Sequence, residues 1–351
     1  MWDRSTEYSG EGEPANRRGG IVDSIRVDGD AYWTGALTIE LVMTHQGLHD
    51  RAAESTMYRL RSRARTDRGH YVVDRLDLQG RRTPMTDSPA MAAEQARRID
   101  TSVPQTARVW NYWLGGKDNY AVDRKLGDEV EAAFPEMVAL ARASRAFLTR
   151  AVRYLAGEAG IRQFLDVGTG LPTADNTHEV AQAVDPTSRI VYVDSDPLVL
   201  VHARALLTSA PEGRTDYIEA DLRDPDRILQ EAGRALDLSQ PVALILGGIL
   251  GHIESHDEAR SLVARLLAPL PSGSYLLSSD GSNTSKGVVE AARIWNLSAN
   301  PRYHVRSPRQ IAAYFDGLMP VEPGIVSVAH WRPDTAHPVF VDTYGGVARK
   351  P

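Results

Sequence analysis

The sequence predicts an α/β protein with a doubly wound, mostly parallel sheet, and three observations carry this prediction. From about residue 160 onward, short apolar segments alternate with segments of helical periodicity. Residues 242–247 are continuously apolar, which is typical of a strand that is covered on both faces. The intervals between apolar segments are long enough for crossover helices, so we expect right-handed βαβ units.

Three helices are expected before the first strand of this sheet. Residues 105–116 form a short aromatic pattern that ends at a glycine pair, and residues 121–133 have the pattern of a second helix. A third helix begins near Pro135 and runs to about Glu158, because apolar side chains recur along it at a spacing of three to four residues.

Seven strands are predicted after these helices. They cover residues 163–168, 189–194, 216–219, 242–247, 274–279, 324–331 and 339–342. Helices are expected at 197–207, 257–267 and 285–297, and another begins at Ser307 with a capping-box pattern. The last two strands are close enough in sequence to pair as an antiparallel edge.

Composition limits the possible functions of these 351 residues. The absence of cysteine excludes disulfides, thiolate metal sites and a cysteine nucleophile. No run of eighteen apolar residues and no secretory signal occur, so we expect a cytoplasmic protein without a membrane partner. The formal charge of −6 argues against nucleic-acid binding by bulk charge, and the histidine spacing suits no metal site.

The first 84 residues differ in composition from the rest. They contain 13 arginines, no lysine and 13 acidic residues, and no helical stripe lasts more than two turns. We predict that residues 1–84 are an extension, disordered or preceding a true start at Met85, and that residues 85–351 are one domain. A regulatory or basic binding arm and a small folded domain are the alternatives for the extension.

A strand followed by a Gly-x-Gly turn is the centre of the predicted chemistry. Asp166 lies just ahead of the turn 168–170, where glycine lets a ligand approach the backbone closely. A dinucleotide fingerprint requires a third glycine at the position of Thr173, and Pro172 has no N–H for a pyrophosphate. S-adenosylmethionine, which has positive charges and no phosphates, therefore fits better than NAD or FAD.

Two more acidic residues follow at the ends of successive strands. Asp194 can accept hydrogen bonds from both ribose hydroxyls, with Asp196 as a second choice or as the cap of the next helix. Asp221 can accept from the adenine amine while Leu222 covers the ring. Parallel strands place these residues on one edge of the sheet, where such ligands bind.

With these motifs the sequence resembles class I S-adenosylmethionine-dependent methyltransferases, and more narrowly a bacterial S-adenosyl methyltransferase family first catalogued as a domain of unknown function. The matching stretches are residues 108–120, 164–173, 176–179, 191–197, 220–225, 321–324, 331–333 and 344–346. The resemblance runs from about Met85 to the C-terminus and implies a Rossmann-like core over 161–351 with an N-terminal helical lid over 85–160. The sequence departs from the family's usual pattern at residues 247–251, which face the substrate.

The predicted cofactor site combines the turn, the acidic residues and part of the lid. Its residues are Tyr112, Gly116, Lys117, Asp166, Gly168, Thr169, Gly170, Asp194, Ser195, Asp221, Leu222 and Gly247. The glycine pair 115–116 has two interpretations: it ends a helix, beside solvated charges at Lys117 and Asp118, or it folds over the methionine end of the cofactor.

The substrate side is less specific. His252 follows the fourth strand and is a candidate base or substrate contact, with Trp295 and Tyr303 as apolar walls. We expect methyl transfer to a small-molecule acceptor, with no metal, and the sequence singles out no catalytic residue. A non-catalytic module that binds S-adenosylmethionine and regulates a partner is the main alternative, and a nicotinamide oxidoreductase is disfavoured by Pro172 and Thr173.

Overall fold

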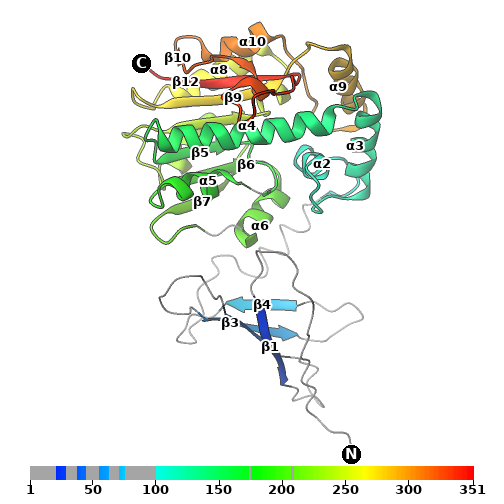
Figure 1. The fold of residues 1–351 in the computed structure, drawn as a ribbon, viewed down its shortest axis with the longest axis vertical. Helices are drawn as coiled ribbons and strands as arrows, with labels where there is room; N and C mark the ends of the chain where they lie inside the picture. Colours follow the sequence, from blue (N-terminus) through cyan, green and yellow to red (C-terminus); the bar gives the residue numbers. More distant parts are fainter. Residues whose placement is uncertain are drawn as a thin grey trace, which may run out of the picture. The chain divides into compact units, whose positions relative to one another are not determined.

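The computed structural model describes residues 21–28, 38–44, 55–62, 71–75, 100–173, 175–206 and 209–351. The chain divides into two units, Met1–Ser88 and Pro89–Pro351. In the first unit, four strands form an antiparallel sheet, drawn in blue to cyan in Figure 1: β1 (Ile21–Asp28), β2 (Thr38–Thr44), β3 (Ser55–Ser62) and β4 (Tyr71–Arg75). The remaining residues of the predicted extension lie outside the described part of the chain. The role and limits of this extension stay predictions.

The second unit is built on an eight-stranded sheet with the order β10-β12-β9-β8-β5-β6-β7, and β11 pairs with β12 beside this path. Its strands are β5 (Gln163–Val167), β6 (Arg189–Asp194), β7 (Arg214–Glu219), β8 (Ala243–Gly247), β9 (Tyr275–Gly281), β10 (Met319–Pro320), β11 (Val326–Ser327) and β12 (Thr343–Arg349). Strands β5 to β9 pair in parallel, whereas β12 runs antiparallel to β9. The predicted fold class, mostly parallel with an antiparallel C-terminal edge, is confirmed, although the sheet has eight strands where seven were predicted.

The C-terminal edge differs from the prediction in detail. Residues 339–342, predicted as a strand, are irregular, and the segment predicted at 324–331 contains only β11 followed by a 3₁₀ turn. The long edge strand is β12. It was not predicted from the sequence because Gly345 and Gly346 lower its strand propensity. A Cβ at Gly346 would lie 2.7 Å from the carbonyl oxygen of Gly324, so the close backbone approach at this edge requires glycine.

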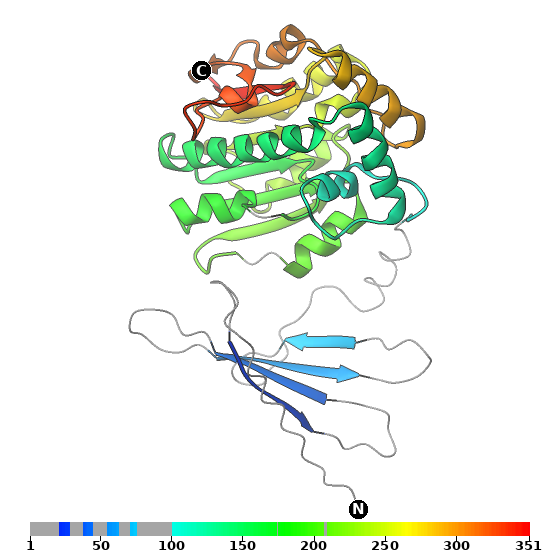
Figure 2. The same ribbon diagram turned by 45° about the vertical axis from the view of Figure 1, so that its right-hand side comes forward.

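Helices cover both faces of the sheet (Figures 1 and 2). One face carries α2 (Thr106–Trp113), α3 (Ala121–Ala133), α4 (Met137–Gly157), α5 (Thr177–Val184) and α9 (Lys286–Ser298). The other carries α7 (Pro225–Ala232), α8 (His256–Leu267) and α10 (Pro308–Ala312), while α6 (Pro197–Leu206) contacts β6 and β7. Because side chains alternate between the two faces of each strand, neighbouring residues contribute to different cores. Phe164 packs on the α4 side, and Leu165 packs on the α8 side.

The order of the strands creates a crevice at the carboxyl edge. The chain builds outward from β5 to β6 and β7, and then returns to the opposite side of β5 with β8. Crossovers that diverge from two neighbouring strands leave space between them, and ligands of doubly wound sheets bind at this switch point. The predicted glycine turn directly follows β5, so it lies at this position.

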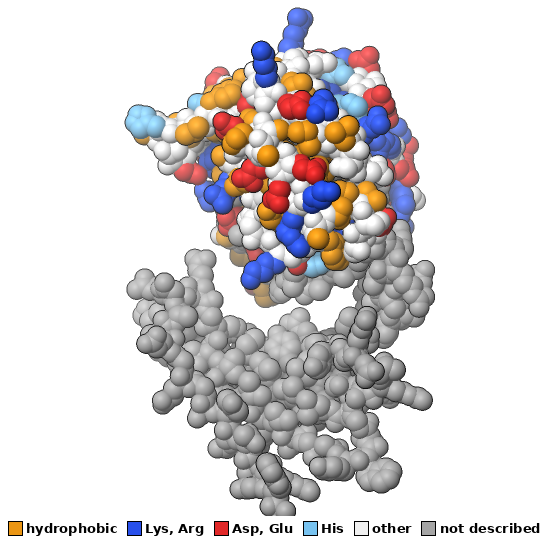
Figure 3. All heavy atoms as spheres, turned by 90° about the vertical axis from the view of Figure 1, so that its right-hand side faces the viewer, with side chains coloured by type: hydrophobic (Ala, Val, Ile, Leu, Met, Phe, Trp, Pro, Cys, Tyr) orange, Lys and Arg blue, Asp and Glu red, His pale blue; other side chains and the backbone are white. Residues whose placement is uncertain are grey.

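Two properties of the second unit concern the predicted partners: the charges on its surface and the apolar character of its helices. Figure 3 shows one face of this unit, on which acidic and basic side chains lie intermixed. Among the described residues, no helix combines the length and the apolar character needed to cross a membrane.

Candidate functional site

A cavity of about 280 Å³ lies at the switch point, bounded by the ends of β5, β6, β8 and β9 and by helices α2, α4 and α9. The predicted residues that line it are Asp166, Gly168, Thr169, Gly170, Asp194, Ser195, Gly247, His252, Trp295 and Tyr303. The predicted residues that are not part of its lining are Tyr112, Gly116, Lys117, Asp221 and Leu222. The structure therefore brings together the turn and the strand ends, and it places part of the predicted site elsewhere.

The glycine turn is fixed to the neighbouring strand. Gly168 and Gly170 have φ angles of 77° and 67°, which other residues rarely adopt. The Gly168 N–H donates to the carbonyl of Val193 at 2.8 Å, and the Gly170 N–H donates to Asp194 Oδ2 at 2.9 Å. A Cβ at Gly168 would lie 2.7 Å from the side chain of Ile249, whereas a Cβ at Gly170 would meet no atom within 4 Å. Gly168 thus serves packing, and Gly170 leaves open space for a ligand.

Asp194 is held by backbone amides on both carboxylate oxygens. Besides the bond from Gly170, its Oδ1 accepts from the N–H of Asp196 at 2.9 Å. Desolvation raises the pKa of Asp194 to about 6, although the amide hydrogen bonds act in the opposite direction. Asp196 accepts from the N–H of Leu198 at 2.9 Å and so caps the start of α6, as the alternative interpretation of this residue predicts.

Asp166 is buried at the end of β5, and α4 brings a cation near it. Its Oδ2 accepts from the hydroxyl of Thr177 at 2.6 Å, and burial raises the pKa of Asp166 to about 6. Arg145 lines the same cavity, donates to the carbonyl of Asp175 at 2.9 Å and favours the ionised form of Asp166. Sequence reasoning missed Arg145, because nothing in the sequence separates it from the other arginines of α4.

Aromatic side chains form much of the remaining wall. The rings of Trp110 and Trp113 lie 5.8 Å apart, and those of Trp113 and Trp295 lie 6.1 Å apart. Tyr303 packs against Gly251, where a Cβ would collide with its ring. This contact gives a physical reason for glycine at position 251.

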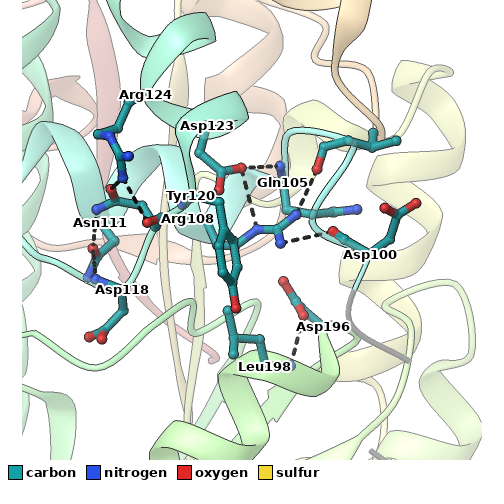
Figure 4. Close-up of polar contacts among 12 residues, drawn as sticks. Asp100, Gln105, Arg108, Asn111, Asp118, Tyr120, Asp123, Arg124, Asp196 and Leu198 are labelled. Atoms are coloured by element: carbon teal, nitrogen blue, oxygen red, sulfur yellow. Dashed lines mark hydrogen bonds and ion pairs between the residues drawn. The ribbon is translucent and has the colours of Figure 1, made fainter. Parts of the chain in front are cut away.

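The helical layer is held together by a buried ion pair, drawn in Figure 4. Arg108 Nε lies 3.4 Å from Asp123 Oδ1, and their side chains are 1% and 0% exposed. Arg108 also donates to the carbonyls of Asp100 and Val103, at 3.0 Å and 2.7 Å. Asp123 accepts from the backbone N–H groups of Gln105 and Tyr120, so every oxygen of this carboxylate is satisfied. The pair joins α2 to α3 and fixes the wall that α2 contributes.

The predicted lid residues lie on the outer side of this layer. Gly115 has a φ of 82° just beyond the end of α2, as expected of a helix-ending glycine. Tyr112 donates its hydroxyl to Asp128 on α3 at 2.6 Å, and Lys117 is exposed. The layer lines the cavity through α2 itself, between Gln105 and Leu114. That Gly116 and Lys117 touch the cofactor stays a prediction.

The predicted adenine residues lie just after β7. Asp221 is exposed, accepts from the N–H of Arg223 at 2.8 Å and pairs with its guanidinium at 3.3 Å, while Leu222 is buried. Their contact with adenine likewise stays a prediction.

A glycine turn with carboxylates at the switch point of a doubly wound sheet is typical of the class of S-adenosylmethionine-dependent methyltransferases. The family model described as S-adenosyl methyltransferase matches residues 92–351, and the chain belongs to this family. Its cofactor is therefore S-adenosylmethionine. None of the curated proteins matches the chain.

Two solved structures are similar over most of the chain. A DUF574 family protein from Streptomyces avermitilis is 46% identical, with a TM-score of 0.69, over 72% of this chain and 100% of its own. A candidate methyltransferase from Thermobifida fusca is 41% identical, with a TM-score of 0.67, over 72% of this chain and 96% of its own.

The cavity fits this cofactor by a direct structural criterion. A Cβ at Gly170, Gly247 or Gly248 would meet no atom within 4 Å, so the backbone at the ends of β5 and β8 is open to a ligand. The carboxylates of Asp166 and Asp194 supply negative charge for a cation, and Arg145 supplies positive charge for a carboxylate.

Proposed function

We propose that the protein transfers the methyl group of S-adenosylmethionine to a small-molecule acceptor. The observation that carries this proposal is the aromatic wall, in which Trp110, Trp113 and Trp295 line the same cavity as the glycine turn. A cavity of about 280 Å³ between helices suits a small acceptor better than a folded macromolecule. The intermixed charges in Figure 3 offer no continuous basic surface on that face.

Each part of the cofactor has a candidate partner in this proposal. Asp194 accepts from the ribose hydroxyls through the lone pairs that its backbone amides leave free. Asp166 faces the ammonium group of the methionine moiety, and Arg145 faces its carboxylate. When bound, S-adenosylmethionine supplies a methyl group already activated by the positive sulfonium. The chain's own contribution is to orient the two reactants and to exclude water, effects worth about 7–11 kcal/mol in favourable cases.

Two measurements test this function. Calorimetry with S-adenosylmethionine and with NAD should show binding of the first only. Incubation with a metabolite extract should then release S-adenosylhomocysteine, which mass spectrometry detects. Tight binding without any release would favour the regulatory module instead. The cytoplasmic location and the lack of a nucleic-acid partner stay predictions from composition.

A further inference from the structure

Several buried polar atoms without a partner belong to residues that line the cavity. Within the described part of the chain, five of the buried side-chain atoms without a hydrogen-bond partner belong to residues of the cavity lining. Two of these residues, His252 and Asp280, both contact Tyr303. A third, Thr343, pairs in register with Gly281, so its side chain faces the opposite side of the sheet from that of Asp280. Buried polar groups nearly always have a partner, so such a cluster beside a cavity indicates a ligand that brings hydrogen-bonding groups.

One carboxylate oxygen of Asp280 accepts two hydrogen bonds, and the other has no partner among the described groups. Its Oδ1 accepts from the hydroxyl of Tyr303 at 2.7 Å and from the N–H of Gly251 at 3.1 Å. The side chain is 1% exposed, and its Oδ2 has no partner among the described groups. Tyr303 itself is fixed, since its hydroxyl accepts from the N–H of Gly281 at 2.9 Å.

The protonation of Asp280 suits a proton acceptor near neutral pH. Burial raises its pKa to about 6, against the opposing effects of the Tyr303 hydroxyl, the Arg306 guanidinium and the Gly251 N–H. Arg306 and Tyr314 face the carboxylate from the segments after α9 and α10. A carboxylate with a pKa slightly below the working pH is ionised and still basic enough to accept a proton.

His252 adds a second acceptor of fixed tautomer. Its Nδ1 lies 2.8 Å from the carbonyl oxygen of Arg302, which can only accept, so Nδ1 carries the proton. Nε2 is then an acceptor, and it is buried without a partner. Burial lowers the pKa of His252 to about 4, so the ring is neutral at physiological pH. Its ring lies edge-on to Tyr303 at 5.1 Å, beside the Asp280 contact.

We propose that His252 and Asp280 form the acceptor subsite, that its substrate is an aromatic compound with a hydroxyl group, and that Asp280 accepts the hydroxyl proton. This inference rests on the proposed function. The rings of Trp295, Tyr303 and His252 provide flat walls for an aromatic acceptor. Both His252 Nε2 and Asp280 Oδ2 accept hydrogen bonds, so the substrate must donate, and its one hydroxyl hydrogen reaches only one of the two acceptors at a time. A hydroxyl needs a base for methylation, whereas a neutral amine has a free electron pair, so the base favours a hydroxyl.

The transfer balances with this assignment. The acceptor oxygen forms the O–CH₃ bond while the C–S bond of the sulfonium breaks, and the electron pair of that bond stays on sulfur. The hydroxyl proton passes to Asp280 Oδ2. Tyr303 positions Asp280, and the ring of His252 lies beside the same tyrosine as part of the wall.

The test uses the full chain saturated with S-adenosylhomocysteine and the probes 7-hydroxycoumarin and 7-methoxycoumarin, whose binding is followed by fluorescence. We expect the hydroxyl probe to bind at least tenfold more tightly than its methyl ether. Asp280→Asn should reduce this ratio to about one, because the amide nitrogen donates where Oδ2 accepts. Asp316→Asn is the matched control, since Asp316 is exposed and pairs only with surface Arg260 among the described residues.

Activity provides a second readout. With S-adenosylmethionine and 7-hydroxycoumarin, kcat/KM should rise with pH through about 6 in the natural protein and lose this rise in Asp280→Asn. If Asp280→Asn fails to fold by thermal melting, His252→Gln takes its place and should lower the binding ratio about threefold.

Three results would overturn the inference: no binding of 7-hydroxycoumarin, an equal affinity for both probes, or tighter binding of 7-amino-4-methylcoumarin than of the hydroxyl probe. Calorimetry separates the two proposals. If S-adenosylhomocysteine itself does not bind, the proposed function fails, whereas its binding together with any of the three results removes the acceptor subsite alone.

Discussion

Two aspartates at the ends of strands in the same sheet, Asp194 and Asp280, differ in how many of their carboxylate oxygens have hydrogen-bond partners. Asp194, the last residue of β6, has both carboxylate oxygens held by backbone amides and is partly exposed. Asp280, near the end of β9, is buried and has one oxygen held by Tyr303 and Gly251 and the other without a partner. The pKa of each is raised to about 6.

The difference shows two ways to prepare a carboxylate for a ligand. The amides around Asp194 fix its orientation and leave its outer lone pairs to hydroxyl groups, which suits binding without proton transfer. The unpartnered oxygen of Asp280 has a free site for a proton. Similar pKa values therefore do not imply similar roles, and the hydrogen-bond partners decide between them.

The strongest test of this comparison removes the first carboxylate. Asp194→Ala should weaken S-adenosylmethionine binding about 100-fold, because two hydrogen bonds to a charged group contribute roughly 3 kcal/mol together. Calorimetry measures the change. Asp216→Ala is the control, because Asp216 lies on the neighbouring strand β7 and pairs with Arg214 of the same strand. Its affinity for S-adenosylmethionine should stay within about twofold of that of the natural protein. Equal effects of the two variants would contradict the assignment of Asp194.

The next effect is a dependence of cofactor affinity on pH. Since the pKa values of Asp166 and Asp194 are raised to about 6, both are ionised above pH 7 and become protonated as the pH falls through 6. Affinity for the positive cofactor should therefore fall about tenfold between pH 7.5 and pH 5. S-adenosylhomocysteine lacks the sulfonium charge and should show a shallower curve. A flat curve for both compounds would argue against carboxylates as the cofactor's partners.

A third prediction, with a smaller expected effect, tests whether the helical layer contributes to cofactor binding. Asn119 donates to Asn111 Oδ1 at 2.9 Å and to the carbonyl of Gly116 at 3.0 Å, so it holds the segment after α2 in place. Asn119→Ala should weaken cofactor binding about fivefold by calorimetry, and Lys117→Ala should weaken it less. Unchanged affinity in both variants would reject the lid.

The smallest expected effect completes the comparison. Asp280→Asn should change S-adenosylmethionine affinity less than about twofold, because Asp280 serves the acceptor and not the cofactor. Calorimetry without an acceptor measures this directly. A loss as large as that of Asp194→Ala would place Asp280 in the cofactor site and remove the contrast between the two aspartates.

Local sequence patterns predicted the elements that depend on local physics. Strand β6 has the predicted bounds of 189–194, helix α3 has those of 121–133, and the glycine turn lies where predicted. Periodicity and glycine placement act within a few residues, so one sequence displays them.

The parts that were missed depend on contacts between distant residues. Asp280 lies in an apolar strand, and its role follows from Tyr303, 23 residues further along the chain. Arg145 shares α4 with three other arginines, and only packing shows which of them faces the cavity. Residues 339–342 were predicted as a strand because their apolar side chains resemble one, yet Val339 is 79% exposed.

The buried ion pair between Arg108 and Asp123 sets how far this protein can be shortened. A chain that begins after Val103 loses both carbonyl partners of Arg108, and one that begins after Arg108 leaves Asp123 as a buried carboxylate without its cation. Removing one partner of such a pair costs about 3–5 kcal/mol, a large share of the stability of an ordinary domain. A fragment that keeps every described partner of Arg108 therefore starts no later than Asp100.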